Sequence, residues 1–155
     1  MSMGLIAAFS MPVFFRNIDK FVMDKEKQAT MGLAYIGEKF VNDARDNGTY
    51  EDRTSNLRGS IAYDVVKNAK SLVSDYSGGG KGDEESKNAS QKAVDDVIVE
   101  NSLWSDNVIW LIGVAGMEYA SAVESKKYDV ITASAPEESD IKALMRDAGI
   151  VGDIV

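Results

Sequence analysis

The stretch NIDKFVMDKEKQATMGLAYIGEKFVNDARD, residues 17–46, decides the fold that we expect for this chain. Asn17 is a suitable N-cap and Asn47-Gly48 a typical helix stop, so the stretch predicts one amphipathic helix about 45 Å long. Gly32 and Gly37 inside it mark a kink or a close backbone contact, and Lys25 is the one breach in its apolar stripe. The stripe recurs at steps of three and four residues: Ile18, Phe21, Val22, Ala29, Leu33, Ile36, Phe40 and Ala44.

Shorter segments on the C-terminal side of this stretch have the patterns of strands and helices. We expect strands over 61–66, 108–114 and 128–133, and the continuous apolar run 108–114 is the best candidate for the central strand. Further helices are expected over about 84–100, over about 119–125, and from Pro136 to Ala148. Thr54 or Ser55 is placed to cap a short helical turn through Arg58.

This order of elements predicts an α+β fold in which the long N-terminal amphipathic helix packs on a mainly antiparallel sheet, followed by a C-terminal helix. We expect a single domain over residues 1–155, with an N-terminal arm over 1–16. The glycine-rich run at 77–83 is typical of a mobile connector. Residues 67–107 are therefore expected to form a flexible arm or insertion.

Composition narrows the classes of function. The chain has 155 residues, no Cys and a net charge of −8, which disfavours binding to the outside of nucleic acid, where lysine and arginine must neutralise phosphates. It remains compatible with a protein that surrounds DNA without gripping it, since an acidic lumen repels the duplex. No apolar run approaches the ~20 residues of a membrane span, so we expect no membrane partner.

No cluster of residues points to catalysis, to a metal or to a cofactor. The chain has neither His nor Cys, so the usual nucleophile–base pairs are missing, although Ser–Lys, carboxylate-pair and metal mechanisms stay formally open. Gly82 follows Lys81 where a phosphate loop needs Ser or Thr. The acidic pairs lack calcium-loop spacing. We therefore expect no enzyme, no cofactor and no metal site.

Two short segments carry a resemblance. The first is Thr54-Ser55-Asn56-Leu57-Arg58-Gly59-Ser60-Ile61, and the second is Gly116-Met117-Glu118-Tyr119-Ala120-Ser121-Ala122-Val123-Glu124. In that order, behind a long amphipathic helix, they resemble the head–tail connector, neck and tail-completion proteins of tailed bacteriophages. The shared framework covers most of residues 17–148, with no clear counterpart for 67–107.

The resemblance implies a virion structural protein, made in the host cytoplasm, that forms a ring at the head–tail junction. Such a ring joins the portal or an adjacent neck or tail protein to the next layer, while DNA passes through its lumen without specific binding. A closed ring needs two different patches on each subunit. The candidate interface residues are Arg53 and Arg58 beside the long helix, Trp104 as a partner anchor, and Phe14 and Phe15 in the apolar N-terminus.

Two other classes stay open at this point. The chain could be a soluble, non-enzymatic adaptor or assembly factor that acts as a monomer or dimer, or a small enzyme with an unrecognised site. Trp110 lies within the apolar run 108–114, so we expect it in the core rather than in an interface.

Overall fold

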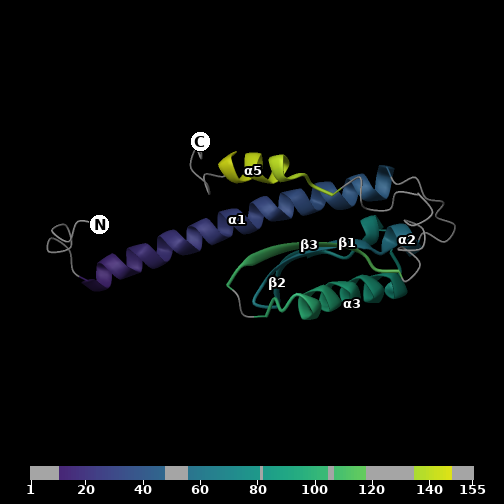
Figure 1. The fold of residues 1–155 in the computed structure, drawn as a ribbon, viewed down its shortest axis with the longest axis horizontal. Helices are drawn as coiled ribbons and strands as arrows, with labels where there is room; N and C mark the ends of the chain where they lie inside the picture. The colour runs from purple at the N-terminus through teal and green to yellow at the C-terminus, as the bar shows by residue number, and fades with distance from the viewer. Residues whose placement is uncertain (1–10, 48–55, 81, 105–106, 118–134, 148–155) are drawn as a thin grey trace.

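A three-stranded antiparallel sheet lies between two helices in the computed structural model, which describes residues 11–47, 56–80, 82–104, 107–117 and 135–147 (Figure 1). The long helix α1 covers one face of the sheet and α3 covers the other, while α5 lies on the side of α1 that faces away from the sheet. The predicted α+β class is confirmed. In chain order the elements are α1 (Met11–Asn47), α2 (Asn56–Gly59), β1 (Ile61–Lys67), β2 (Lys70–Asp75), η2 (Gly78–Gly80), α3 (Glu84–Glu100), β3 (Ile109–Ala115) and α5 (Glu138–Asp147).

Among the described strands the order is β2-β1-β3, so β1 lies in the middle and β3, the predicted central strand, pairs with β1. β3 reads as a continuous apolar run because a helix covers each face of the sheet. β1 includes Asp64, yet all six of its residues from Ile61 to Val66 are buried. Trp110 in β3 is 38% exposed, so the expectation that it lies in the core is wrong.

Side chains of β1 contribute to two apolar cores, one on each face of the sheet, because successive side chains of a strand point to opposite faces. Odd-numbered positions of β1 face α1, and even-numbered positions face α3. The first core comprises Phe40, Val41, Ala44, Leu57, Ile61, Tyr63 and Val65. The second comprises Ala62, Val66, Val94, Ile98, Leu103, Ile112 and Val114.

Helix α1 begins at Met11, earlier than the predicted cap at Asn17, and its 37 residues make a rod about 55 Å long. Residues 11–16, expected in an N-terminal arm, therefore belong to the helix, with Pro12 in its first turn as proline tolerates. Residues 1–10 lie outside the described residues. The N-terminal turns of α1 extend past the end of the sheet (Figure 1). Phe21, in the N-terminal half of α1, is 62% exposed.

Gly37 explains how α1 approaches the sheet so closely. A Cβ at this position would come within 2.4 Å of the Tyr63 ring, so only glycine lets the helix lie on that aromatic side chain. The close backbone contact predicted for Gly37 is thereby confirmed.

Residues 67–107, predicted as a flexible arm, instead build the sheet and its second covering layer where the structure describes them. β2 pairs with β1 through a two-residue turn at Asn68 and Ala69, both with positive φ. The glycine run packs rather than projects: Gly78, with φ +62°, is buried against Gly59. The composition of the glycine run suggested mobility, but glycine is needed here because it has no side chain and lets two backbone segments pack closely.

Two of the remaining predicted elements are confirmed, and the others lie outside the residues that the structure describes. Helix α3 matches the prediction for 84–100, and the Asp83 carboxylate caps it by accepting from the Ser86 N–H at 2.8 Å. α5 matches the helix expected after Pro136. The predicted helix 119–125 and strand 128–133, and the caps Thr54 and Ser55, lie outside the described residues. Within the described part of the chain, no helix has both the length and the apolarity to cross a bilayer.

Candidate subunit interface

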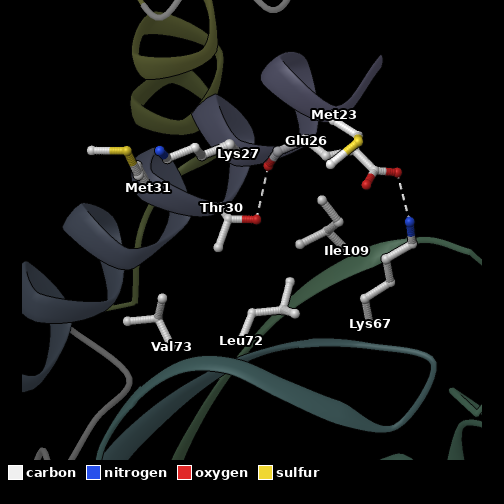
Figure 2. Close-up of a pocket in the computed structure, with 9 residues that line it drawn as sticks. All are labelled: Met23, Glu26, Lys27, Thr30, Met31, Lys67, Leu72, Val73 and Ile109. Atoms are coloured by element: carbon white, nitrogen blue, oxygen red, sulfur yellow. Dashed lines mark hydrogen bonds and ion pairs between the residues drawn. The ribbon is translucent and has the colours of Figure 1, made fainter. Parts of the chain in front are cut away.

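A groove with a volume of about 400 Å³ opens between α1 and the sheet on the side of β2 (Figure 2). Leu72, Val73 and Ile109 form its apolar floor, and five side chains of α1 form its roof. These are Met23, Glu26, Lys27, Thr30 and Met31, and Lys67 of β1 closes one end. Helix α1 contacts β2 less than it contacts β1, which leaves this side of the sheet open.

A β-bulge supplies the floor. Val65 pairs with Val73 and Val66 with Ser71, so Leu72 is the extra residue in β2. An inserted residue breaks the strict alternation of a strand. Leu72 and Val73 therefore both point toward α1 although they are adjacent in the sequence (Figure 2). They are 45% and 37% exposed.

Two polar contacts fix the roof of the groove. The Lys67 ammonium lies 2.6 Å from the Glu26 carboxylate, which ties the end of β1 to α1. The Thr30 hydroxyl donates to the Glu26 carbonyl at 2.8 Å. Met23 and Met31 are 68% and 63% exposed, and methionine adapts to irregular apolar partners. The groove is thus suited to an apolar segment rather than to a small charged ligand.

At the other end of α1, Arg45 fixes the helix to the sheet. Its guanidinium is buried, donates from Nη2 to the Ile61 carbonyl at 2.7 Å, and pairs from Nη1 with the Asp75 carboxylate at 3.1 Å. Burial alone would raise the pKa of Asp75, but hydrogen bonds from Ser77 and the charge of Arg45 outweigh it and hold that pKa below its usual value. The sequence patterns did not reveal this ion pair, because its partners lie 30 residues apart.

A buried carboxylate joins β2 to β1 on the opposite face. Asp64 accepts hydrogen bonds from the Ser71 hydroxyl at 2.6 Å and the Tyr76 hydroxyl at 2.7 Å. Burial raises the pKa of Asp64, and the two hydrogen bonds only partly offset that effect. Burial followed by the hydrogen bond to Asp64 also raises the pKa of Tyr76. These hydrogen bonds hold β2 against β1, and they lie on the face of the sheet opposite the groove.

Of the five predicted interface residues, the structure describes the side chains of two, Arg58 and Trp104. Arg58 lies in α2 and is half-buried, while Trp104 follows α3 and is 50% exposed. Neither lines the groove. Phe14 and Phe15 belong to the projecting turns of α1, but their side chains are not described, and Arg53 lies outside the described residues. The groove was missed because it depends on the bulge and on the path of α1, which no local pattern encodes.

Neither a metal-binding cluster nor a comparison with known proteins assigns a chemistry to the described residues. Within residues 11–47, 56–80, 82–104, 107–117 and 135–147, no group of three or more acidic, His or Cys side chains is arranged to hold a metal ion. No family model matches the sequence, and comparisons with curated proteins and with solved structures find no significant match.

Proposed function

We propose that this protein is a non-enzymatic structural component of a tailed-phage virion, which forms a ring in the neck and joins the portal or an adjacent neck or tail protein to the tail. The two resembling segments and the α+β fold support this proposal. In the fold, Ser60 of the first segment and Gly116 of the second lie together, because the Gly116 N–H donates to the Ser60 carbonyl at 3.0 Å.

The observation that carries the proposal is that one subunit exposes apolar side chains on two different elements, α1 and β2. One set lies in the N-terminal half of α1, where Phe21 and Val22 are 62% and 49% exposed. The other is the groove floor of Leu72 and Val73. Exposed apolar surfaces of this kind mark interaction sites. Two different patches are what a head-to-tail ring requires, whereas a two-fold dimer uses one patch twice.

The net charge of −8 fits a ring around DNA. An acidic inner surface repels the phosphate backbone, so the duplex passes without being held. This proposal therefore includes no specific contact with bases.

The test combines the composition of purified virions with the mass of the isolated protein in solution. We expect the chain in particles, at the same copy number in each. Its absence from particles would overturn the proposal and favour a soluble adaptor or assembly factor acting as a monomer or dimer. A monomer in solution is compatible with a ring that closes only on the portal, so particle composition is the deciding readout.

A further inference from the structure

We propose that the groove between α1 and β2 binds residues 148–155 of a second copy of this chain. The inference rests on the proposed ring and names the contact that would join its subunits. Its evidence is the chemistry of the groove, the edge of the sheet beside it, and the reach of the segment that follows α5.

The lining of the groove is complementary to an apolar segment that carries a negative charge. Its floor is Leu72, Val73 and Ile109. Lys27 and Lys67 line it, and Lys70 is the cross-strand partner of Lys67 and shares its face. Glu26 is the one acidic residue among the nine that line the groove, and its carboxylate pairs with Lys67. The groove is thus positively charged in a chain whose total charge is −8.

The edge of the sheet beside the groove is suited to an extended segment. Among the described strands β2 is an outer one in the order β2-β1-β3, and an outer strand presents backbone groups that pair with an added strand. Peptides commonly bind by such strand addition, with alternate side chains entering pockets. An extended segment on β2 would pass directly beside the exposed Leu72 and Val73.

Residues 148–155 have this chemistry in their sequence, although they lie outside the described residues. They read Ala148-Gly149-Ile150-Val151-Gly152-Asp153-Ile154-Val155. Four of them are β-branched and apolar, which favours strands, and Asp153 is the only charged side chain. The segment therefore offers apolar side chains to the floor and one carboxylate to the lysines.

Geometry favours a second copy over the same copy. α5 contacts α1 on the side away from the sheet, whereas the groove lies on the sheet side (Figure 1). With a helix diameter of about 10–12 Å, a path from α5 around α1 is roughly 20–25 Å. Residues 148–155 span about 26 Å when fully extended, so little of this segment would remain to lie along β2. A neighbouring subunit presents the same segment without this detour.

Cysteine trapping tests the contact cleanly, because the chain contains no Cys. Two purified full-length variants with different tags, Leu72→Cys and Ile154→Cys, are mixed under mild oxidation. We expect the mixed disulfide dimer to form at least about tenfold faster than in a control mixture of Gln91→Cys with Ile154→Cys. Gln91 is exposed on α3, on the opposite side of the sheet. Circular dichroism of each variant verifies that it is folded.

A second arm tests the charge, since Asp153→Lys in the Ile154→Cys copy is expected to slow the reaction at least threefold at low ionic strength. A rate equal to that of the Gln91→Cys control would overturn the inference. So would an internal disulfide, with none between copies, in a variant that carries both Leu72→Cys and Ile154→Cys. Faster reaction of Leu72→Cys with Leu5→Cys would also overturn it, because the N-terminal segment would then be the occupant of the groove. A chain found in virion rings without this cross-link would refute the inference alone. A cross-linked chain absent from virions would refute only the proposed function.

Discussion

The backbone N–H of Gly116 donates to the carbonyl of Ser60 at 3.0 Å, which joins two segments that lie more than fifty residues apart in the sequence. The Ser60 hydroxyl extends the contact, since it accepts from the Met117 N–H at 3.2 Å and donates to the Leu57 carbonyl at 2.8 Å. Ile61 and Ala115 pair directly beside it. The described parts of the two segments, residues 56–61 and 116–117, thus meet at the end of the sheet.

Gly116 is expected to tolerate no side chain. A Cβ there would lie 2.3 Å from the backbone nitrogen of Ser90 in α3, and backbone cannot move aside as a side chain can. We expect Gly116→Ala to lower the free energy of unfolding by about 2–3 kcal/mol. Gly80→Ala is the control, because a Cβ at Gly80 meets nothing within 4 Å and adds only the strain of φ +77°, about 1 kcal/mol. Equal losses in urea unfolding would contradict this account.

The hairpin between β1 and β2 is expected to become more stable with glycine. Asn68 and Ala69 have φ of 51° and 61°, the left-handed geometry of a two-residue turn that prefers Asn-Gly. Ala69→Gly should raise the free energy of unfolding by about 0.5–1 kcal/mol because it removes the strain on Cβ. Ala143→Gly in the middle of α5 should lower it by about 1 kcal/mol. A loss at both positions in thermal unfolding would show that the turn is not strained.

The buried Arg45–Asp75 pair is expected to contribute more than an exposed pair. Arg45→Met leaves Asp75 without its counter-charge and removes the donor to the Ile61 carbonyl, so the free energy of unfolding should fall by about 3 kcal/mol. Lys92→Met removes a pair with Asp96 whose side chains are 78% and 54% exposed, and should cost about 0.5 kcal/mol or less. Chemical denaturation measures both. Similar losses would mean that Arg45 is not a clamp.

Asp64 is expected to make stability depend on pH in a defined direction. Its pKa is raised by burial, so the folded state holds this proton more tightly than the unfolded state. Its contribution is therefore fully present below the ordinary pKa of about 4 and is lost as pH rises through the raised value. We expect the stability of wild type minus that of Asp64→Asn to fall as pH rises from about 3.5 to 7. A difference that is constant with pH would contradict the raised pKa.

Much of the fold could be predicted from the sequence, because its signals are local. The three- and four-residue steps of Leu33, Ile36, Phe40 and Ala44 revealed α1, and they are buried or half-buried in the structure. The same stripe failed at Phe21 and Val22, which are 62% and 49% exposed. Periodicity shows that residues share a face, but it does not show where the covering surface ends.

The errors concern relationships between distant segments. The run 108–114 suggested a central strand because both faces of the sheet are covered, but among the described strands the middle position belongs to β1. The glycine run read as flexible, but Gly78 and Gly82 pack against Gly59 where side chains would not fit. The groove depends on one extra residue in β2, and such a shift of register leaves no mark in composition.

Imaging of the head–tail junction of intact virions at a resolution that separates helices tests the central claim most directly. We expect circular density around the DNA channel in which each repeat accommodates the rod of α1, the three-stranded sheet and α3. If the junction contains no ring into which this fold can be placed, the protein is not a neck component.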